Sequence, residues 1–154
     1  MTGELTGDTI HASAVKLPLG GVLLLGSSGS GKSSLALQLI DHYGGQLTAD
    51  DRVCLTVIGN NLQAAPPDNL AGLIELRGLG IITVPHQNAM IDLAVELVSR
   101  KQLPRLAKAE SFSYQGINVP LIRLHGHDMT SAGIIARALE FVSESGLSPD
   151  SVYR

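Results

Sequence analysis

A short glycine-rich segment constrains this chain more than any other part of it. Residues 26–33 read GSSGSGKS and fill the pattern Gly-x-x-x-x-Gly-Lys-Ser. Glycines adopt positive φ at little cost, so the backbone of such a loop can turn several N–H groups toward one anion. The lysine supplies an ammonium group for β and γ phosphates, and the serine supplies a hydroxyl for Mg²⁺. The pattern predicts a nucleotide-phosphate loop formed by Gly26, Ser27, Ser28, Gly29, Ser30, Gly31, Lys32 and Ser33.

The segments on either side of this loop have the patterns of a strand and a helix. Residues 21–25, GVLLL, form an apolar run of strand length. Residues 33–43 carry leucines at helical spacing and are followed by Gly44-Gly45, a pair typical of a helix C-terminus. The positive end of this helix would face the bound phosphate. A plain glycine-rich turn, the alternative interpretation, needs neither the lysine nor the serine.

The composition limits the class of protein. A chain of 154 residues can bury one adequate core, so we expect a single domain over 1–154. Hydrophobic residues make up 44%, with two Phe and no Trp, which favours an aliphatic α/β core. The net charge of −3, without a basic cluster, argues against nucleic acid as a partner. The single cysteine excludes an intrachain disulfide, and we expect neither a signal peptide nor a membrane span, which predicts a cytoplasmic protein.

Hairpins are expected around the strand, loop and helix. The predicted elements are strands at 10–15, 47–51, 53–58, 62–65, 89–98, 112–115 and 119–125, a short helix from Asp68 through Ile74, and a final helix that starts at Asp128, Thr130 or Ser131 and ends at Gly146. Parallel and antiparallel pairs must then coexist in one mixed sheet. The segment 74–84, IELRGLGIITV, mixes charge and glycine into an apolar run and does not fit an ordinary buried strand.

Acidic residues follow the predicted helix where they could meet the phosphates. Asp50 and Asp51 close the strand 47–51, which would lie beside the loop. Glu75 is a further hard oxygen ligand for Mg²⁺. Taken alone, the two aspartates also fit a solvated turn before a hairpin, and Glu75 fits either interpretation.

Three histidines have alternative interpretations. His11 lies in a predicted strand, where a ring bonded to the backbone is a common arrangement. His125 and His127 would share one face of a strand, but no third ligand for a metal site is evident beyond Asp128.

Four segments together resemble one enzyme family: GSSGSGKS at 26–33, LTADDRV at 47–53, AAPP at 64–67 and IELRGLGIITV at 74–84. They are similar to the catalytic domain of the bifunctional HPr(Ser) kinase/phosphorylase, a bacterial enzyme with a phosphoenolpyruvate carboxykinase-like variant of the P-loop fold. The resemblance covers most of residues 9–140 and implies an α/β fold with a mixed sheet and flanking helices. It also implies ATP- and Mg²⁺-dependent phosphorylation of a serine on HPr, the phosphocarrier of the sugar phosphotransferase system, often with phosphate-driven removal of that group.

The resemblance implies catalytic roles for four residues. Asp50 would accept the proton of the serine hydroxyl, and Lys32 would hold the transferred phosphoryl group. His11 would tune or receive the proton. Arg105, in the match Pro104-Arg105-Leu106, would lie near the transferred group.

The resemblance also implies a metal site and an assembly. Ser33 and Glu75 would bind Mg²⁺, with support from Asp51. Members of the family form hexamers through this domain, so a homo-oligomer is expected.

The chain departs from the family pattern in three respects. We expect no N-terminal regulatory domain, and the stretch between the 74–84 signature and Arg105 is shorter than usual. The segment VPLIRLHGHD, residues 119–128, replaces one that ends in glycine and arginine and is linked to dephosphorylation. Weak phosphorylase activity is therefore expected. Two other functions are left open: a catalytically silent nucleotide-sensing module, and a small-molecule kinase that uses the same loop.

Overall fold

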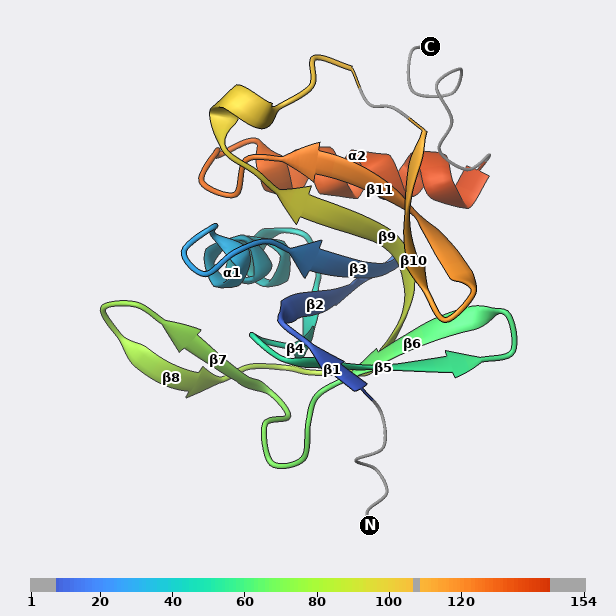
Figure 1. Ribbon diagram of the computed structural model, residues 1–154. Coiled ribbons are helices and arrows are strands. Elements are labelled where there is room, and N and C mark those ends of the chain that lie inside the picture. The colour runs from blue at the N-terminus through green and yellow to red at the C-terminus, as the bar shows by residue number, and fades with distance from the viewer. Residues whose placement is uncertain (1–7, 107–108, 145–154) are drawn as a thin grey trace.

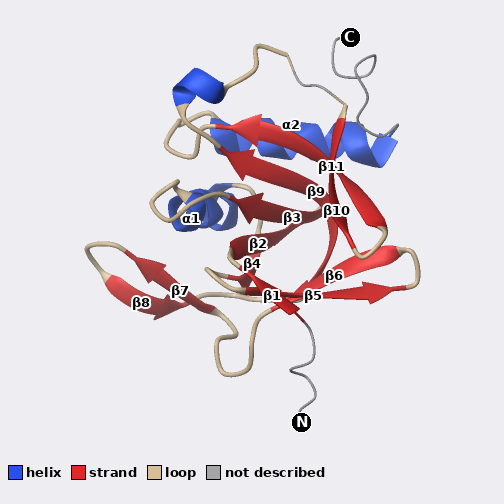
Figure 2. Ribbon diagram, viewed as in Figure 1, coloured by secondary structure: helices blue, strands red, loops and turns tan. Residues whose placement is uncertain are grey.

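The computed structural model describes residues 8–106 and 109–144 (Figure 1). The elements are β1 (Asp8–Ile10), β2 (Ala12–Leu17), β3 (Gly20–Leu25), α1 (Lys32–His42), β4 (Gln46–Ala49), β5 (Val53–Ile58), β6 (Asn61–Ala65), β7 (Leu73–Leu76), β8 (Gly80–Thr83), β9 (Ala89–Leu97), the short 3₁₀ turn η2 (Arg100–Gln102), β10 (Glu110–Tyr114), β11 (Ile117–Leu124) and α2 (Ser131–Glu144). They form a curled mixed sheet, a separate β7–β8 hairpin and, among the described residues, two α-helices (Figure 2). Neither helix is both long and apolar enough to span a membrane.

Strand β9 joins the parts of the large sheet. Its first residues pair antiparallel with β6, and its later residues pair in parallel with β3 on one side and β11 on the other. The path through the sheet is β1-β5-β6-β9-β3-β2-β4, and β10 pairs with β11. Parallel and antiparallel pairs therefore coexist, as the sequence predicts.

The middle of the sheet is buried on both faces. Val22 and Leu24 of β3 belong to the core cluster that includes α1 and α2, whereas Leu23 belongs to the cluster on the opposite face. Successive side chains of a strand point to opposite faces, so each face of β3 needs its own apolar cover. The helices cover one face, and residues of β5, β6 and β11 cover the other. This two-sided burial explains the unbroken apolar run in the sequence.

The structure confirms the strand before the loop, the helix after it, and the hairpin of β5 and β6. The predicted helix from Asp68 through Ile74 is wrong. Asn69 and Gly72 have φ of 70° and 76°, which interrupts helical geometry, and the chain enters β7 at Leu73. The segment 74–84 instead folds on itself as the β7–β8 hairpin, and this satisfies its backbone without burying its charges.

Two predicted boundaries also change, and the start of the last helix agrees with the prediction. The strand expected at 10–15 is interrupted at His11, because β1 pairs with β5 whereas β2 pairs with β3 and β4. Strand β4 ends at Ala49, so both aspartates lie just beyond it. Helix α2 begins at Ser131, and its predicted end at Gly146 lies outside the described residues.

We predict that Leu93→Ala in β9 lowers the free energy of unfolding by about 2–5 kcal/mol, since its side chain is fully buried in the core beside the helices. The matched change Ile81→Ala, at a side chain that is 66% exposed on the hairpin, should cost less than about 1 kcal/mol. Urea unfolding of the two variants measures both values. Equal losses would contradict the difference in burial between the two side chains.

Candidate active site

The phosphate loop, residues 26–33, connects the C-terminal end of β3 to the start of α1 (Figure 1). Gly29 and Gly31 have φ of 83° and 102°, a region that residues with a side chain rarely adopt. Gly31 is the N-cap of α1, and no side chain caps this helix end and no acidic residue lies in its first turn. The positive end of α1 is thus left for an external anion. The side chain of Ser30 adds a buried hydroxyl without a partner among the described residues.

Lys32 is held inside this loop. Its side chain is only 6% exposed, and its ammonium group donates hydrogen bonds to the carbonyl oxygens of Gly26 at 2.7 Å and Ser27 at 3.0 Å. Burial lowers the pKa of Lys32, and the negative charges of Asp51 and Asp50 partly oppose this shift. A cation removed from water in this way interacts strongly with an incoming anion.

Asp50 lies where four segments meet. Its Oδ1 atom accepts hydrogen bonds from the hydroxyls of Ser33 at 2.7 Å and Ser13 at 2.9 Å. Its Oδ2 atom accepts the backbone N–H of Glu75 at 3.3 Å. The carboxylate thereby connects β2, the end of β4, the start of α1 and strand β7 of the hairpin. Asp50 is therefore part of the phosphate-loop site and not a residue of a solvated turn.

Asp51 and His11 form the outer part of the same cluster. The Nε2 atom of His11 lies 2.8 Å from Oδ1 of Asp51, and both side chains are exposed. The backbone N–H of Asp51 donates to the hydroxyl of Ser13 at 3.2 Å. His11 thus bonds to Asp51, and among the described residues no hydrogen bond joins it to Asp50. The backbone-bonded strand histidine is not what the structure shows.

Oxygen donors of the kind that Mg²⁺ prefers occur at this corner, where the hydroxyl of Ser33 is bonded to Asp50. Glu75 follows Ile74 in β7, its backbone N–H donates to Asp50, and its side chain is exposed. In the part of the chain that the structure describes, no group of three or more His, Cys, Asp or Glu side chains is arranged to hold a metal ion. Mg²⁺ is usually held by one or two carboxylates together with water and substrate phosphates, so a site for this ion does not require a closed set of protein ligands.

Arg105 lies in another place. It is exposed after η2 and lines a pocket of about 370 Å³ between β11 and α2. Within residues 8–106 and 109–144, it forms no hydrogen bond or ion pair with the phosphate loop. The structure thus brings Lys32, Ser33 and Asp50 together but does not bring Arg105 into contact with them.

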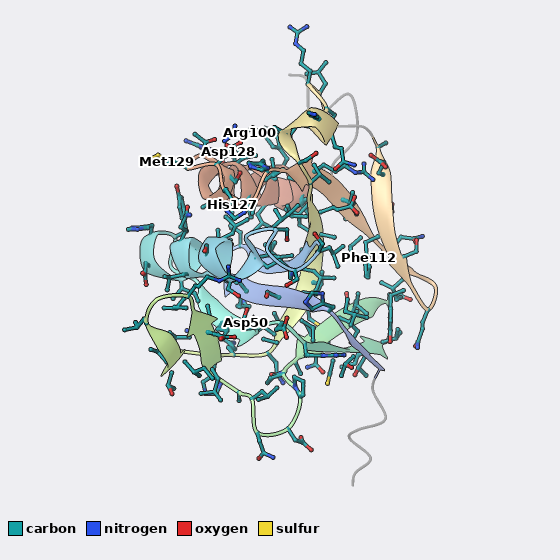
Figure 3. All side chains as sticks on the ribbon, turned by 60° about the vertical axis from the view of Figure 1, so that its left-hand side comes forward. Asp50, Arg100, Phe112, His127, Asp128 and Met129 are labelled. Carbon is teal, nitrogen blue, oxygen red and sulfur yellow. The ribbon has the colours of Figure 1, made fainter. Side chains whose placement is uncertain are left out.

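A second loop, residues 125–128, packs against the phosphate loop. Nε2 of His127 lies 3.0 Å from the carbonyl oxygen of Gly29, and Nδ1 of His125 lies 2.8 Å from that of Val98. A Cβ atom on Gly126 would lie 2.0 Å from the Ser30 carbonyl oxygen, so this approach requires glycine. Figure 3 shows His127 beside Asp128 at this end of the molecule.

The prediction that His125 and His127 share a strand face is wrong, because β11 ends at Leu124. Both rings lie in the loop and meet edge to face, with centroids 5.5 Å apart. The contacts of Ser13 and Gly126 in the site were not predicted from the sequence. Ser13 had a detectable signal, because it is a hydroxyl within the apolar run ASAV. Gly126 had a weaker one, since a glycine between two histidines fits many loops.

The chain is similar to proteins of one known family. Residues 5–138 match the family model described as the HPr Serine kinase C-terminal domain. The chain belongs to this family. The HPr kinase/phosphorylase of Caldanaerobacter subterraneus subsp. tengcongensis is 43% identical over 98 residues, which cover 58% of this chain and 32% of that protein. The HPr kinase/phosphorylase of Xylella fastidiosa is 30% identical over an alignment of 164 residues, covering 94% of this chain and 52% of that protein.

A solved structure shares the fold. The Hpr(Ser) kinase/phosphatase from Coxiella burnetii superposes with a TM-score of 0.75 at 30% identity, covering 86% of this chain and 88% of that chain. The chain spans about a third to a half of the length of the two curated relatives. Its curled sheet with two helices is thus the fold of a solved HPr kinase.

We predict that Gly126→Ala weakens ATP binding at least about tenfold, because the added methyl group must displace the Ser30 carbonyl and with it the phosphate loop. Calorimetric titration with ATP measures the affinity. Gly133→Ala is the matched control, since its Cβ would meet Tyr43 alone, at 3.1 Å from the hydroxyl oxygen. Unchanged affinity in Gly126→Ala, with the melting temperature preserved, would show that the second loop does not shape the phosphate loop.

Proposed function

We propose that this domain is an ATP- and Mg²⁺-dependent serine kinase that phosphorylates HPr, the phosphocarrier of the sugar phosphotransferase system. The hydrogen bond between Asp50 and Ser33 carries the proposal, because it holds a carboxylate beside the phosphate loop and the buried Lys32. Membership of the HPr Serine kinase C-terminal domain family supports the reaction and its substrate. The strand–loop–helix unit within a mixed sheet supports the P-loop fold of the phosphoenolpyruvate carboxykinase-like type.

The residues at the site would act mainly by position and charge. In phosphoryl transfer the serine oxygen bonds to the γ phosphorus, the bond from that phosphorus to ADP breaks, and the serine proton must be accepted. Lys32 and the N–H groups of the loop would hold the phosphates. A carboxylate has about four lone-pair positions, and the three donors on Asp50 leave one for a substrate hydroxyl. Asp50 would orient that hydroxyl and take its proton.

Ser33 and Glu75, with Asp51 beside them, would bind Mg²⁺. Hard oxygen donors are the ligands that this ion prefers. When bound, the ion neutralises charge that develops on the phosphate oxygens.

Roles are also proposed for His11 and Arg105. His11 would act on the reaction through Asp51, its hydrogen-bond partner. The proposed role of Arg105 near the transferred group rests on the resemblance alone. We also propose that the protein acts in the cytoplasm as a homo-oligomer, a hexamer by the same resemblance, without nucleic acid or membrane partners.

Phosphoryl transfer to HPr tests the function. With labelled ATP and Mg²⁺, label should appear on a serine of HPr, and Lys32→Ala should lower the rate to less than about a tenth because a cation on the phosphates is lost. Melting curves of both proteins control for folding. Binding of ATP without transfer would favour a nucleotide-sensing module, and label on a small molecule instead of HPr would favour a different kinase. Either result would contradict the proposal.

Removal of the phosphate by inorganic phosphate is proposed to be weak. This step brings two phosphate anions together and needs cations around them. In the segment 119–128, Arg123 forms ion pairs with Glu110 and, at 2.9 Å, with Glu96. The hydrogen bond to Glu110 raises the pKa of Arg123, and the Glu96 carboxylate adds to this shift. The positive charge of Arg123 is therefore already balanced by this protein's own carboxylates.

We predict that pyrophosphate release from serine-phosphorylated HPr and millimolar phosphate is about 30- to 1,000-fold slower than the kinase reaction, the effect of one missing cation in a partly dry site. Pyrophosphate assays near pH 6 and near pH 8 measure it. Equal forward and reverse rates near pH 8 would contradict the prediction.

A further inference from the structure

A buried hydroxyl lies behind the two aspartates of the site. Ser13 is in β2 between Ala12 and Ala14, and its side chain has no exposed surface. A hydroxyl in such surroundings is unfavourable unless its hydrogen bonds are made. Ser13 makes two, and both go to the aspartate pair. It donates to Oδ1 of Asp50 at 2.9 Å and accepts the backbone N–H of Asp51 at 3.2 Å.

The second of these bonds supports an uncommon backbone conformation. Asp51 has φ of 68°, in the left-handed region that residues other than glycine seldom adopt. The chain turns sharply here, and the N–H of Arg52 donates to the carbonyl oxygen of Asp50 at 2.8 Å. The bond from the Asp51 N–H to Ser13 ties this turn to the rigid centre of the sheet. It thereby sets the direction in which each aspartate side chain leaves the backbone.

The first bond is independent of the phosphate loop. Oδ1 of Asp50 also accepts a bond from Ser33, but Ser33 belongs to the loop that would rearrange around a nucleotide and Mg²⁺. Ser13 belongs to a strand that pairs on both sides, with β3 and β4. Its hydroxyl can therefore hold the same carboxylate oxygen before and after a ligand binds.

We propose that Ser13 is a positioning residue that fixes both carboxylates of the site, Asp50 directly and Asp51 through its backbone. It touches neither nucleotide nor substrate in this proposal and acts through the aspartates. The inference rests on the proposed kinase function for its kinetic consequence. Its structural part, the tie between Ser13 and the Asp51 backbone, stands apart from that function.

Removal of the Ser13 hydroxyl should lower turnover and leave nucleotide binding unchanged. Ser13→Ala should lower kcat by about 10- to 100-fold, because Asp50 loses the hydroxyl donor that comes from the sheet and keeps only the bonds from Ser33 and the Glu75 N–H. The KM for ATP should stay within about twofold, since the loop and Lys32 are unchanged. Ser13→Thr, which keeps a hydroxyl, should recover most of the lost kcat.

A second readout needs no activity. In ¹H–¹⁵N spectra of the full chain, Ser13→Ala should move the amide proton of Asp51 upfield and increase its exchange rate with water, since that N–H loses its acceptor. If Ser13→Thr fails to fold because of its extra methyl group, this measurement on Ser13→Ala still decides the structural part.

Thr48→Val is the matched control. Thr48 is 1% exposed in the neighbouring strand β4, and its hydroxyl donates to the carbonyl oxygen of Gln87 at 2.9 Å. This variant also loses a buried hydrogen bond, so its melting temperature should fall by a similar amount, but kcat and the Asp51 amide should not change.

Three results would overturn the proposal: a kcat for Ser13→Ala within about twofold of wild type, an equal loss of kcat in Thr48→Val, or an unchanged Asp51 amide. Absence of transfer in the wild-type protein would contradict the proposed kinase function instead. The Asp51 amide would then test the tie to Ser13 by itself.

Discussion

The site depends on one carboxylate that is bonded from three directions. Asp50 accepts hydrogen bonds from a central strand, from the helix after the phosphate loop and from the β7–β8 hairpin. Each donor comes from a different part of the sequence, so the carboxylate holds together segments that local propensity could not bring into contact. Unpaired donors at a partly buried position are costly, and this favours the single arrangement that satisfies all three.

The sheet explains why those segments arrive at the same point. Strand β3 is buried on both faces and therefore lies at the centre of the fold, with the phosphate loop at its C-terminal end. Strand β2 runs antiparallel beside it, which brings its first residues level with the end of β3, where Ala12 pairs with Leu25. Helix α1 packs back over the same sheet through Leu35 and Leu39. The buried core of the sheet thus fixes the position of the phosphate loop.

Much of this arrangement could be predicted from local pattern. The strand, loop and helix around residues 26–33 follow from an apolar run, three glycines and helical spacing, which act over short distances. The helix from Asp68 was wrong because an aspartate after two prolines also resembles a helix start. The hairpin of β7 and β8 was missed because charge and glycine interrupt the apolar run 74–84, and only pairing in space reveals its two strands. The residue types of the site could be predicted, but not which of its residues hydrogen-bond to one another. Nothing local indicates that His11 bonds to Asp51, or that Ser13 joins the two aspartates.

The contact between the two glycine-containing loops brings together segments that lie far apart in the sequence. A Cβ on Gly31 would meet the backbone of Gly126 at 3.0 Å, so the two backbones lie in direct contact with no side chain between them to absorb a shift. On the far side, the hydroxyl of Ser131 at the start of α2 donates to the carbonyl oxygen of His125 at 2.7 Å. The first turns of both helices thus contact the same pair of loops: Gly31 caps α1, and Ser131 of α2 is bonded to the second loop.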